Sequence, residues 1–461
     1  MTETTIEQKT FIWEPQPQAA LIVRDLLNQF KRHCPAAQVL ETDLLEKTGT
    51  RLIDWVDHLA IPDDATVSGG SVVQRLKAAG FTFKESQGRI VFTNHEGMFP
   101  EIEILSAGNW RLAVKVEDVT NYLVAHGLDS SAEIQGAPCS PLRKACVCRC
   151  DDSQLWVVER HGALGWEPED IDAKKLRLLL HHREALRLRQ RNAIDDADGF
   201  FAARTLIRRA VADIGVNRTC DLFFAAEREY WQSRNHAARV QKARQDRFGM
   251  GWANHDHHTY RSSRECFAEL INSLEELGFQ CRERFYAGQE AGWGAQVLQQ
   301  PACGVVIFAD VDLAPNEVMG DFAHLGLSPS ERLGTVGVWC KLHGEAFLKA
   351  GMHHLECQFD FKAATKQLKE CGVDSMAPFT DFPFLKQAFT KPEIWQAEES
   401  RIDAALQAKY ITPKQAKSFR ESGAVGSHLE ILERNDGYKG FNQTGISHII
   451  QQTDPRKQAA V

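Results

Sequence analysis

The run GWANHDHHTYR, from Gly251 to Arg261, gathers three histidines beside an arginine. If this run is a β-strand, alternation places His255 and His257 on one face and His258 on the other, and Arg261 returns to the His257 face. An imidazole and a guanidinium on one inward face can hold a metal ion and an anionic ligand together. His257 is therefore the first candidate metal ligand, with His255 and His258 as alternates.

Two later runs carry the other candidate ligands. In GMHHLECQFDF, His354 and Glu356 share a strand face. In SHLEILER, His428 and Glu430 share a face and Glu433 lies opposite. We take His354 and Glu430 as candidate ligands and keep Glu433 as the alternate carboxylate.

Together, His257, His354 and Glu430 would form a facial triad of two histidines and one carboxylate, which leaves coordination positions open for substrate and dioxygen. The alternative is that these histidines are ordinary, partly buried side chains with hydrogen-bond partners, since histidines beside Tyr, Trp and Asp often are. Their positions in repeated units favour the metal site.

The segment GYKGFNQTG, from Gly437 to Gly445, follows the last candidate strand. Its glycines permit close backbone approach and turns with positive φ. Gln443 and Thr444 are therefore candidate substrate-binding residues, and a plain turn is the alternative. The chain has no strand-preceded G-x-G-x-x-G, no G-x-S-x-G and no H-E-x-x-H, which argues against Rossmann, α/β-hydrolase and zincin chemistry.

Composition describes a soluble globular protein with two or three cores, because 461 residues exceed the usual domain size about threefold. Lys and Arg total 54 against 62 Asp and Glu, so the net charge of -8 disfavours nucleic-acid binding. The N-terminus lacks signal-peptide features, and no stretch approaches 18 consecutive apolar residues. We expect no membrane association, a cytoplasmic location and reduced thiols for the 12 cysteines.

The elements that position these residues follow a repeated β-α-β-β-β pattern. We expect an N-terminal helical arm over residues 1–50, a first α+β domain over 51–166, a helical bridge over 167–248 and a metal-binding α+β domain over 249–461. The last repeat is expected to begin with a strand over TVGVWCKL. The predicted fold class is α+β, with tandem βαβββ half-barrels joined by the helical bridge.

The C-terminal half resembles the bacterial 2-oxoadipate dioxygenase/decarboxylase (hydroxyglutarate synthase) family, a branch of the vicinal oxygen chelate superfamily. Three places carry the resemblance: the His-x-x-x-Arg pair His257 and Arg261, the strand HHLECQFDF with His354 followed by FLKQAFTK, and GSHLEILER with Glu430. The spacing before the carboxylate is shorter than in the family, which keeps Glu433 open as the alternate.

The resemblance implies vicinal-oxygen-chelate-like half-barrels and an Fe(II) enzyme, although another divalent metal is an alternative. It also implies that a small anionic 2-oxo acid chelates the metal. Arg261 would then be a substrate-binding and catalytic residue that binds the distal carboxylate of this acid through two hydrogen bonds. Dioxygen would drive oxidative decarboxylation to a 2-hydroxy acid.

The N-terminal half resembles a degenerate domain of the same superfamily. His58, His95, Glu103 and Glu159 could form a second site there, and an inactive scaffold is the favoured interpretation. Two other functions stay open for the whole chain: a redox-neutral, metal-dependent lyase or isomerase of the glyoxalase type, and a ligand-binding protein without turnover. The sequence also leaves open whether the two halves pair with each other or a homodimer forms.

Overall fold

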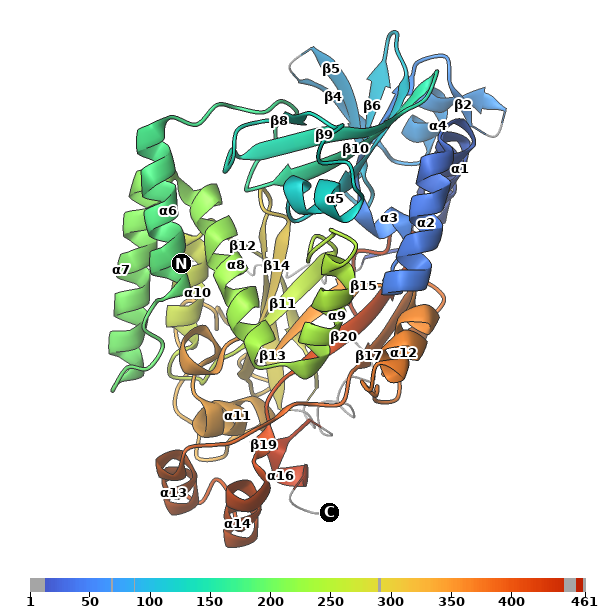
Figure 1. The fold of residues 1–461 in the computed structure, drawn as a ribbon. Coiled ribbons are helices and arrows are strands. Elements are labelled where there is room, and N and C mark those ends of the chain that lie inside the picture. Colours follow the sequence, from blue (N-terminus) through green and yellow to red (C-terminus); the bar gives the residue numbers. More distant parts are fainter. Residues whose placement is uncertain (1–12, 68, 87, 289–291, 443–452, 459–461) are drawn as a thin grey trace, which may run out of the picture.

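The computed structural model describes residues 13–67, 69–86, 88–288, 292–442 and 453–458. Two eight-stranded sheets form its centre (Figure 1). The chain enters through three helices: α1 (Pro17–His33), α2 (Pro35–Thr48) and α3 (Leu52–Trp55). The apolar side chains of α1 and α2 are buried in the same core cluster as those of the first sheet.

The first sheet has the strand order β4-β5-β6-β1-β7-β10-β9-β8. Because β1 and β7 are adjacent and antiparallel, two βαβββ units meet at the middle of the sheet, with α4 (Val72–Ala78) and α5 (Val119–Ala125) as their helices. A short ribbon of β2 (Thr66–Val67) and β3 (Gly70–Ser71) precedes α4. The eight strands are β1 (Val56–Pro62), β4 (Thr82–Ser86), β5 (Arg89–Thr93), β6 (Glu101–Leu105), β7 (Trp110–Lys115), β8 (Ile134–Gln135), β9 (Leu142–Arg149) and β10 (Ser153–Arg160).

The second sheet repeats this plan with the order β12-β13-β14-β11-β15-β20-β17-β16. Its two units meet at β11 and β15, and their helices are α10 (Phe267–Glu276) and α12 (Phe361–Glu370). The eight strands are β11 (His255–Arg261), β12 (Gln280–Tyr286), β13 (Trp293–Gln300), β14 (Val305–Asp312), β15 (His354–Gln358), β16 (Thr380–Phe382), β17 (Leu385–Phe389) and β20 (His428–Arg434).

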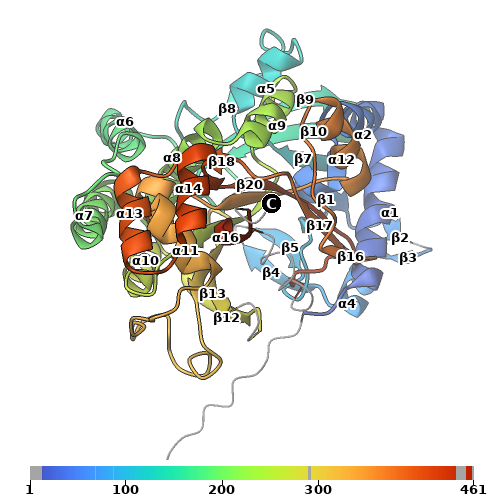
Figure 2. The same ribbon diagram turned by 90° about the horizontal axis from the view of Figure 1, so that it is seen from below.

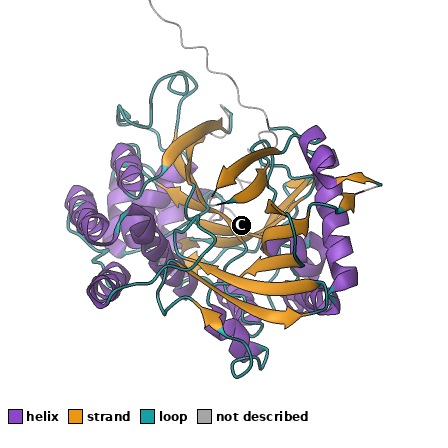
Figure 3. Ribbon diagram, turned by 90° about the horizontal axis from the view of Figure 1, so that it is seen from above, coloured by secondary structure: helices purple, strands orange, loops and turns teal. Residues whose placement is uncertain are grey.

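The helices lie along two flanks of the strands (Figures 2 and 3). Between β10 and β11 in the sequence, the chain forms four helices: α6 (Ala173–Arg187), α7 (Asp196–Ile214), α8 (Val216–Ser233) and α9 (His236–Asp246). Side chains of α8 such as Phe223 and Phe224 are buried in one cluster with Tyr260 of β11. The remaining elements are α11 (Thr335–His343), the π-helical turn η1 (Ala346–Ala350), α13 (Glu399–Gln407), α14 (Pro413–Ser422), α16 (Pro455–Gln458) and the ribbon of β18 (Ile394–Trp395) and β19 (Ala424–Val425).

The predicted α+β class with tandem βαβββ units is confirmed by these two sheets. One predicted element is wrong: TVGVWCKL is the helix α11 and not a strand. Almost all of α11 is buried, and a short apolar run buried on every side does not distinguish a helix from a strand by its periodicity. No helix among the described residues is long and apolar enough to cross a membrane.

The two sheets also agree in their register. The pairing of β1 with β7 shifts between Val56 and His58, and the pairing of β11 with β15 shifts between His255 and His257. The shifts make His58 the counterpart of His257. Counting along the paired strands makes Arg160 at the end of β10 the counterpart of Arg434 at the end of β20.

Candidate metal centre

Three adjacent strands bring the predicted ligands together. His257 comes from β11, His354 from β15 and Glu430 from β20, and β15 lies between the other two. One donor atom of each lies within 4.8 Å of the donors of the other two. His354 Nε2 is 3.0 Å from Glu430 Oε2, and all three side chains are buried.

The alternate ligands point elsewhere. His255 was expected on the face of His257, but the register shift at Asp256 turns it to the face of His258, and the His255 and His258 rings make an edge contact at 5.3 Å. A bulge reverses strand parity in this way, and alternation alone does not reveal it. Glu433 accepts a hydrogen bond from the backbone N–H of Phe361 and stays outside the ligand group.

A carboxylate orients the first histidine. His257 Nδ1 lies 3.2 Å from Asp256 Oδ2, which leaves Nε2 directed at the other donors. Arg434 donates to both oxygens of Asp256, at 2.9 and 3.0 Å. Burial would raise the pKa of Asp256, but Arg434 and His257 hold it well below its ordinary value. Carboxylate partners of this kind fix the tautomer and orientation of metal-bound histidines.

A second carboxylate and an amide lie beside the three candidate ligands. Glu356 Oε2 lies 3.1 Å from His257 Nε2, and Gln387 Nε2 donates to Glu430 Oε1 at 3.0 Å. Burial and the neighbouring Glu430 raise the pKa of Glu356 to about 8. Burial alone would lower the pKa of His257, but Glu356 and Asp256 raise it to about 10.

These residues fit a divalent cation. Asp256, Glu356 and Glu430 are buried carboxyl groups, and Arg434 is the arginine that pairs with this cluster. Buried carboxylates are costly unless a cation compensates them. Two imidazole nitrogens and a carboxylate oxygen suit Fe(II) and other first-row divalent metals.

An arginine with spare donors lies at the same cavity, whose volume is about 70 Å³. Arg261 is 2% exposed, and its Nε and Nη1 atoms have no hydrogen-bond acceptor among the described residues. Its guanidinium lies 5.6 Å from the centre of the Trp339 ring. Asp310 is its register partner on β14, but burial raises the pKa of Asp310 to about 7, so this carboxyl is a weak counter-charge. An anionic ligand would satisfy the arginine.

The cavity wall is mainly aromatic. Phe308 and Phe441 pack edge to face at 4.4 Å, and Phe441 also meets the His257 ring at 5.3 Å. An apolar wall excludes water and strengthens electrostatic interactions inside the cavity. The remaining lining residues are Thr259, Phe285, Trp293, His353, Phe379, Gln387, Phe389, Asn442 and Thr453.

Three residues of this centre were not predicted as site residues: Asp256, Glu356 and Gln387. Alternation in HHLECQ did place Glu356 on the face of His354, and that signal could have identified it. Asp256 and Gln387 carry no comparable signal, because a bulge and a separate strand bring them in. The predicted substrate residues Gln443 and Thr444 lie outside the described residues.

The first sheet keeps only part of this arrangement. Arg160 donates to both oxygens of Asp57, as Arg434 does to Asp256, and Asp57 also contacts His58 at 2.7 Å. The register places Arg111 where the second sheet has His354, and Trp156 where it has Glu430. Two of the three triad positions therefore carry side chains that do not bind metals.

The four residues considered for a second site do not gather in one group. Trp166 packs against the ring of His58 at 4.3 Å. His95 is exposed. Glu103 pairs with Arg89, and Glu159 with Arg143. Within the described part of the chain, these side chains form no common metal-ligand group.

Comparison with solved structures finds distant likenesses. Neither the family models nor the curated protein sequences match the chain. A mutant of 4-hydroxymandelate synthase from Streptomyces coelicolor is 11% identical, covers 88% of this chain and 98% of its own, and has a TM-score of 0.27.

Two other structures cover less of the chain. A putative hydrolase from Shewanella frigidimarina is 12% identical, covers 54% of this chain and 98% of its own, and has a TM-score of 0.29. Methylmalonyl-CoA epimerase from Mycobacterium tuberculosis is 13% identical, covers 40% of this chain and 88% of its own, and has a TM-score of 0.22. Likenesses this distant assign neither a family nor an activity.

Proposed function

We propose that the protein is a non-haem, Fe(II)-dependent dioxygenase/decarboxylase acting on a 2-oxo acid that carries a second carboxylate, such as 2-oxoadipate. The net reaction consumes one dioxygen, releases carbon dioxide and leaves a 2-hydroxy acid one carbon shorter. The observation that supports this most is the meeting of His257, His354 and Glu430 at one cavity with Arg261, whose Nε and Nη1 have no acceptor among the described residues.

Each residue has a defined role in this proposal. Iron, when bound, supplies a Lewis acid and a redox partner for dioxygen. His257, His354 and Glu430 hold the metal, and Asp256 keeps the His257 ring in the tautomer that presents Nε2. Arg261 binds the distal carboxylate of the substrate and thereby orients its 2-oxo acid end toward the triad.

Metal analysis and oxygen uptake test the proposal. We expect anaerobically purified protein reconstituted with Fe(II) to retain about one metal per chain and to consume dioxygen with 2-oxoadipate but not with a monocarboxylic 2-oxo acid of similar length. His354→Ala should lose both properties. Arg261→Lys should keep the metal and raise KM, because an ammonium cannot form the two-pronged contact. Absence of oxygen uptake with every 2-oxo acid tested would reject the proposed reaction.

A redox-neutral, metal-dependent lyase or isomerase is the second candidate, and Glu356 favours it. Its Oε2 atom is 3.1 Å from His257 Nε2, and it forms a second ligand-spaced group with Asp256 and His257, so a movement of its side chain toward the triad would make it a fourth protein donor. Four protein donors leave fewer positions for dioxygen. Retention of Zn, Ni or Mn with turnover in the absence of oxygen would support this candidate over the oxygenase.

A further inference from the structure

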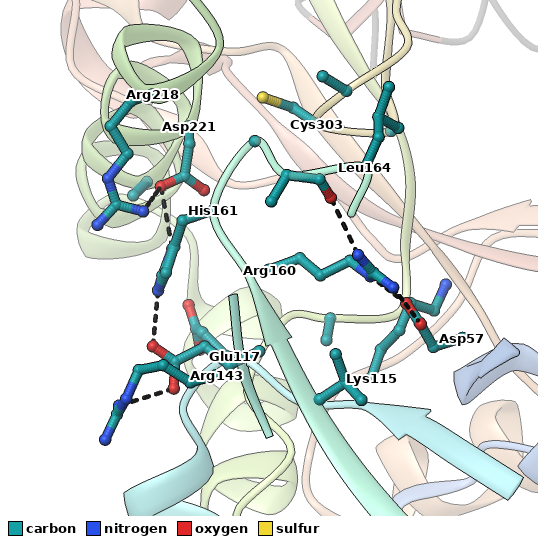
Figure 4. A pocket seen from close by; sticks show the side chains of 18 of the residues that line it. Asp57, Lys115, Glu117, Arg143, Arg160, His161, Leu164, Arg218, Asp221 and Cys303 are labelled. Atoms are coloured by element: carbon teal, nitrogen blue, oxygen red, sulfur yellow. Dashed lines mark hydrogen bonds and ion pairs between the residues drawn. The ribbon is translucent and has the colours of Figure 1, made fainter. Parts of the chain in front are cut away.

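A large cleft between the first sheet, helix α8 and the start of β11 shares no lining residue with the cavity of the metal centre. Its volume is about 930 Å³, which is ample for a small organic ligand. Lys115 of β7 and Arg160 of β10 line one side, and Asp221 of α8 lines the other (Figure 4). Arg228, also on α8, is a further lining residue. The beginning of β11 contributes His255.

Most charged groups of the cleft are already paired. Arg160 forms two hydrogen bonds to Asp57, at 2.7 and 2.8 Å. On the other side, Arg218 pairs with Asp221 at 3.2 Å, and Asp221 contacts His161 at 3.0 Å (Figure 4). These ion pairs fix the positions of the lining side chains, and within each pair the opposite charges compensate one another.

Two cations inside the cleft, Lys115 and Arg228, have no carboxylate partner among the described residues; Lys84 and Arg183 also lack one but are exposed. Lys115 forms no hydrogen bond or ion pair with any described residue, and burial lowers its pKa. Arg228 has a buried Nε without an acceptor, and its Nη1 reaches only His258 Nε2 at 3.4 Å. Both cations line the same cleft as His255, whose buried Nδ1 has no hydrogen-bond partner among the described residues. Lys115, Arg228 and His255 therefore belong to one patch.

Uncompensated cations in a partly buried cleft cost free energy, and an anion would remove that cost. The carboxylates of the cleft walls are already hydrogen-bonded to other arginines, Asp57 to Arg160 and Asp221 to Arg218. Apolar side chains lie in the same cleft, among them Leu222 and Trp252. The lining therefore combines free positive charge with an apolar surface.

We propose that this cleft is a second ligand site for a small organic anion, a carboxylate or a phosphate ester, held by Lys115 and Arg228 at its charged end and by Leu222 and Trp252 along its apolar part. The site is separate from the metal centre, because the register shift at Asp256 turns His255 into the cleft and His257 toward the triad.

Calorimetric titration of the full chain with phenyl phosphate and with phenylacetate tests the site and separates the two anion types. Lys115→Met and Arg228→Gln should each weaken the better probe about 10- to 100-fold, the range expected for one lost charge-assisted hydrogen bond. Lys84→Met and Arg183→Gln are matched controls, because both residues are exposed at the rim of the same cleft. Neither control should change the affinity more than about threefold.

Further measurements locate the probe and control for folding. The Arg261→Gln variant should bind the probe with wild-type affinity, since Arg261 lines the cavity of the metal centre and not the cleft. Lys115→Arg should retain binding, and the Tm of Lys115→Met without probe should stay equal or rise. The proposal is overturned if the wild type binds neither probe at millimolar concentration, if Arg261→Gln abolishes binding, or if Lys115→Met lowers the Tm and leaves the affinity unchanged.

Discussion

The paired substitutions Asp256→Asn and Asp57→Asn separate metal binding from folding. Both aspartates accept two hydrogen bonds from an arginine and contact the Nδ1 atom of the neighbouring histidine. Only Asp256 stands beside the proposed triad, because Arg111 and Trp156 occupy two triad positions in the first sheet. The first sheet therefore supplies a control matched in geometry.

The distances set the expected magnitudes. Loss of a carboxylate that orients a metal-bound histidine weakens metal binding about 10- to 100-fold. The contact from Asp256 to His257 is long, at 3.2 Å, so we expect Asp256→Asn to fall near the lower end, about tenfold or about 1.4 kcal/mol. Both substitutions damage a buried arginine pair, and the amide oxygen keeps one acceptor, so each should destabilise folding by about 3 kcal/mol or somewhat less.

Anaerobic Fe(II) titration and chemical denaturation of both variants measure these effects. We expect similar losses of unfolding free energy in the two variants but weakened metal binding in Asp256→Asn alone. Equal weakening by Asp57→Asn would show that the loss arises through general destabilisation. Unchanged metal affinity in Asp256→Asn would refute the orienting role of that carboxylate.

Further predictions concern the metal, the pH dependence and the core. Glu430→Gln should reduce bound metal, measured by elemental analysis, more than Glu356→Gln does, because Glu430 is the triad carboxylate. Burial raises the pKa of Glu345 from 4.5 to about 7, so its stabilising contribution is complete below pH 4.5 and is lost as the pH rises through 7. Glu345→Gln removes this carboxyl, so the free energy of unfolding of the variant minus that of the wild type should be about 3 kcal/mol higher at pH 8 than at pH 4.5 in denaturation experiments. The same pH dependence of stability in both proteins would contradict this. Phe347→Ala, at a ring 1% exposed and stacked on Phe200 at 5.3 Å, should cost about 3 to 5 kcal/mol of unfolding free energy, and a loss below about 1 kcal/mol would contradict its place in the core.

Periodicity predicted the repeated units well and the short buried segments poorly. Alternating strands and amphipathic helices such as α10 and α12 have one apolar face, and their sequence reports it. The helix α11 is buried almost all round, so TVGVWCKL reads equally well as a strand. The strand Thr82–Ser86 was not predicted because its largely exposed side chains lack an apolar alternation.

The sequence by itself determined that His257, His354 and Glu430 sit on strands of repeated units, because residue type and period-two alternation are local properties. Only the tertiary structure decided that β15 lies between β11 and β20, and that Glu356 and Asp256 form a second group around His257. It also decided that a single inserted residue, Asp256, sends His255 into the cleft that Lys115 and Arg228 line. Strand neighbours and bulges depend on hydrogen bonds between segments distant in sequence, and local patterns do not encode these.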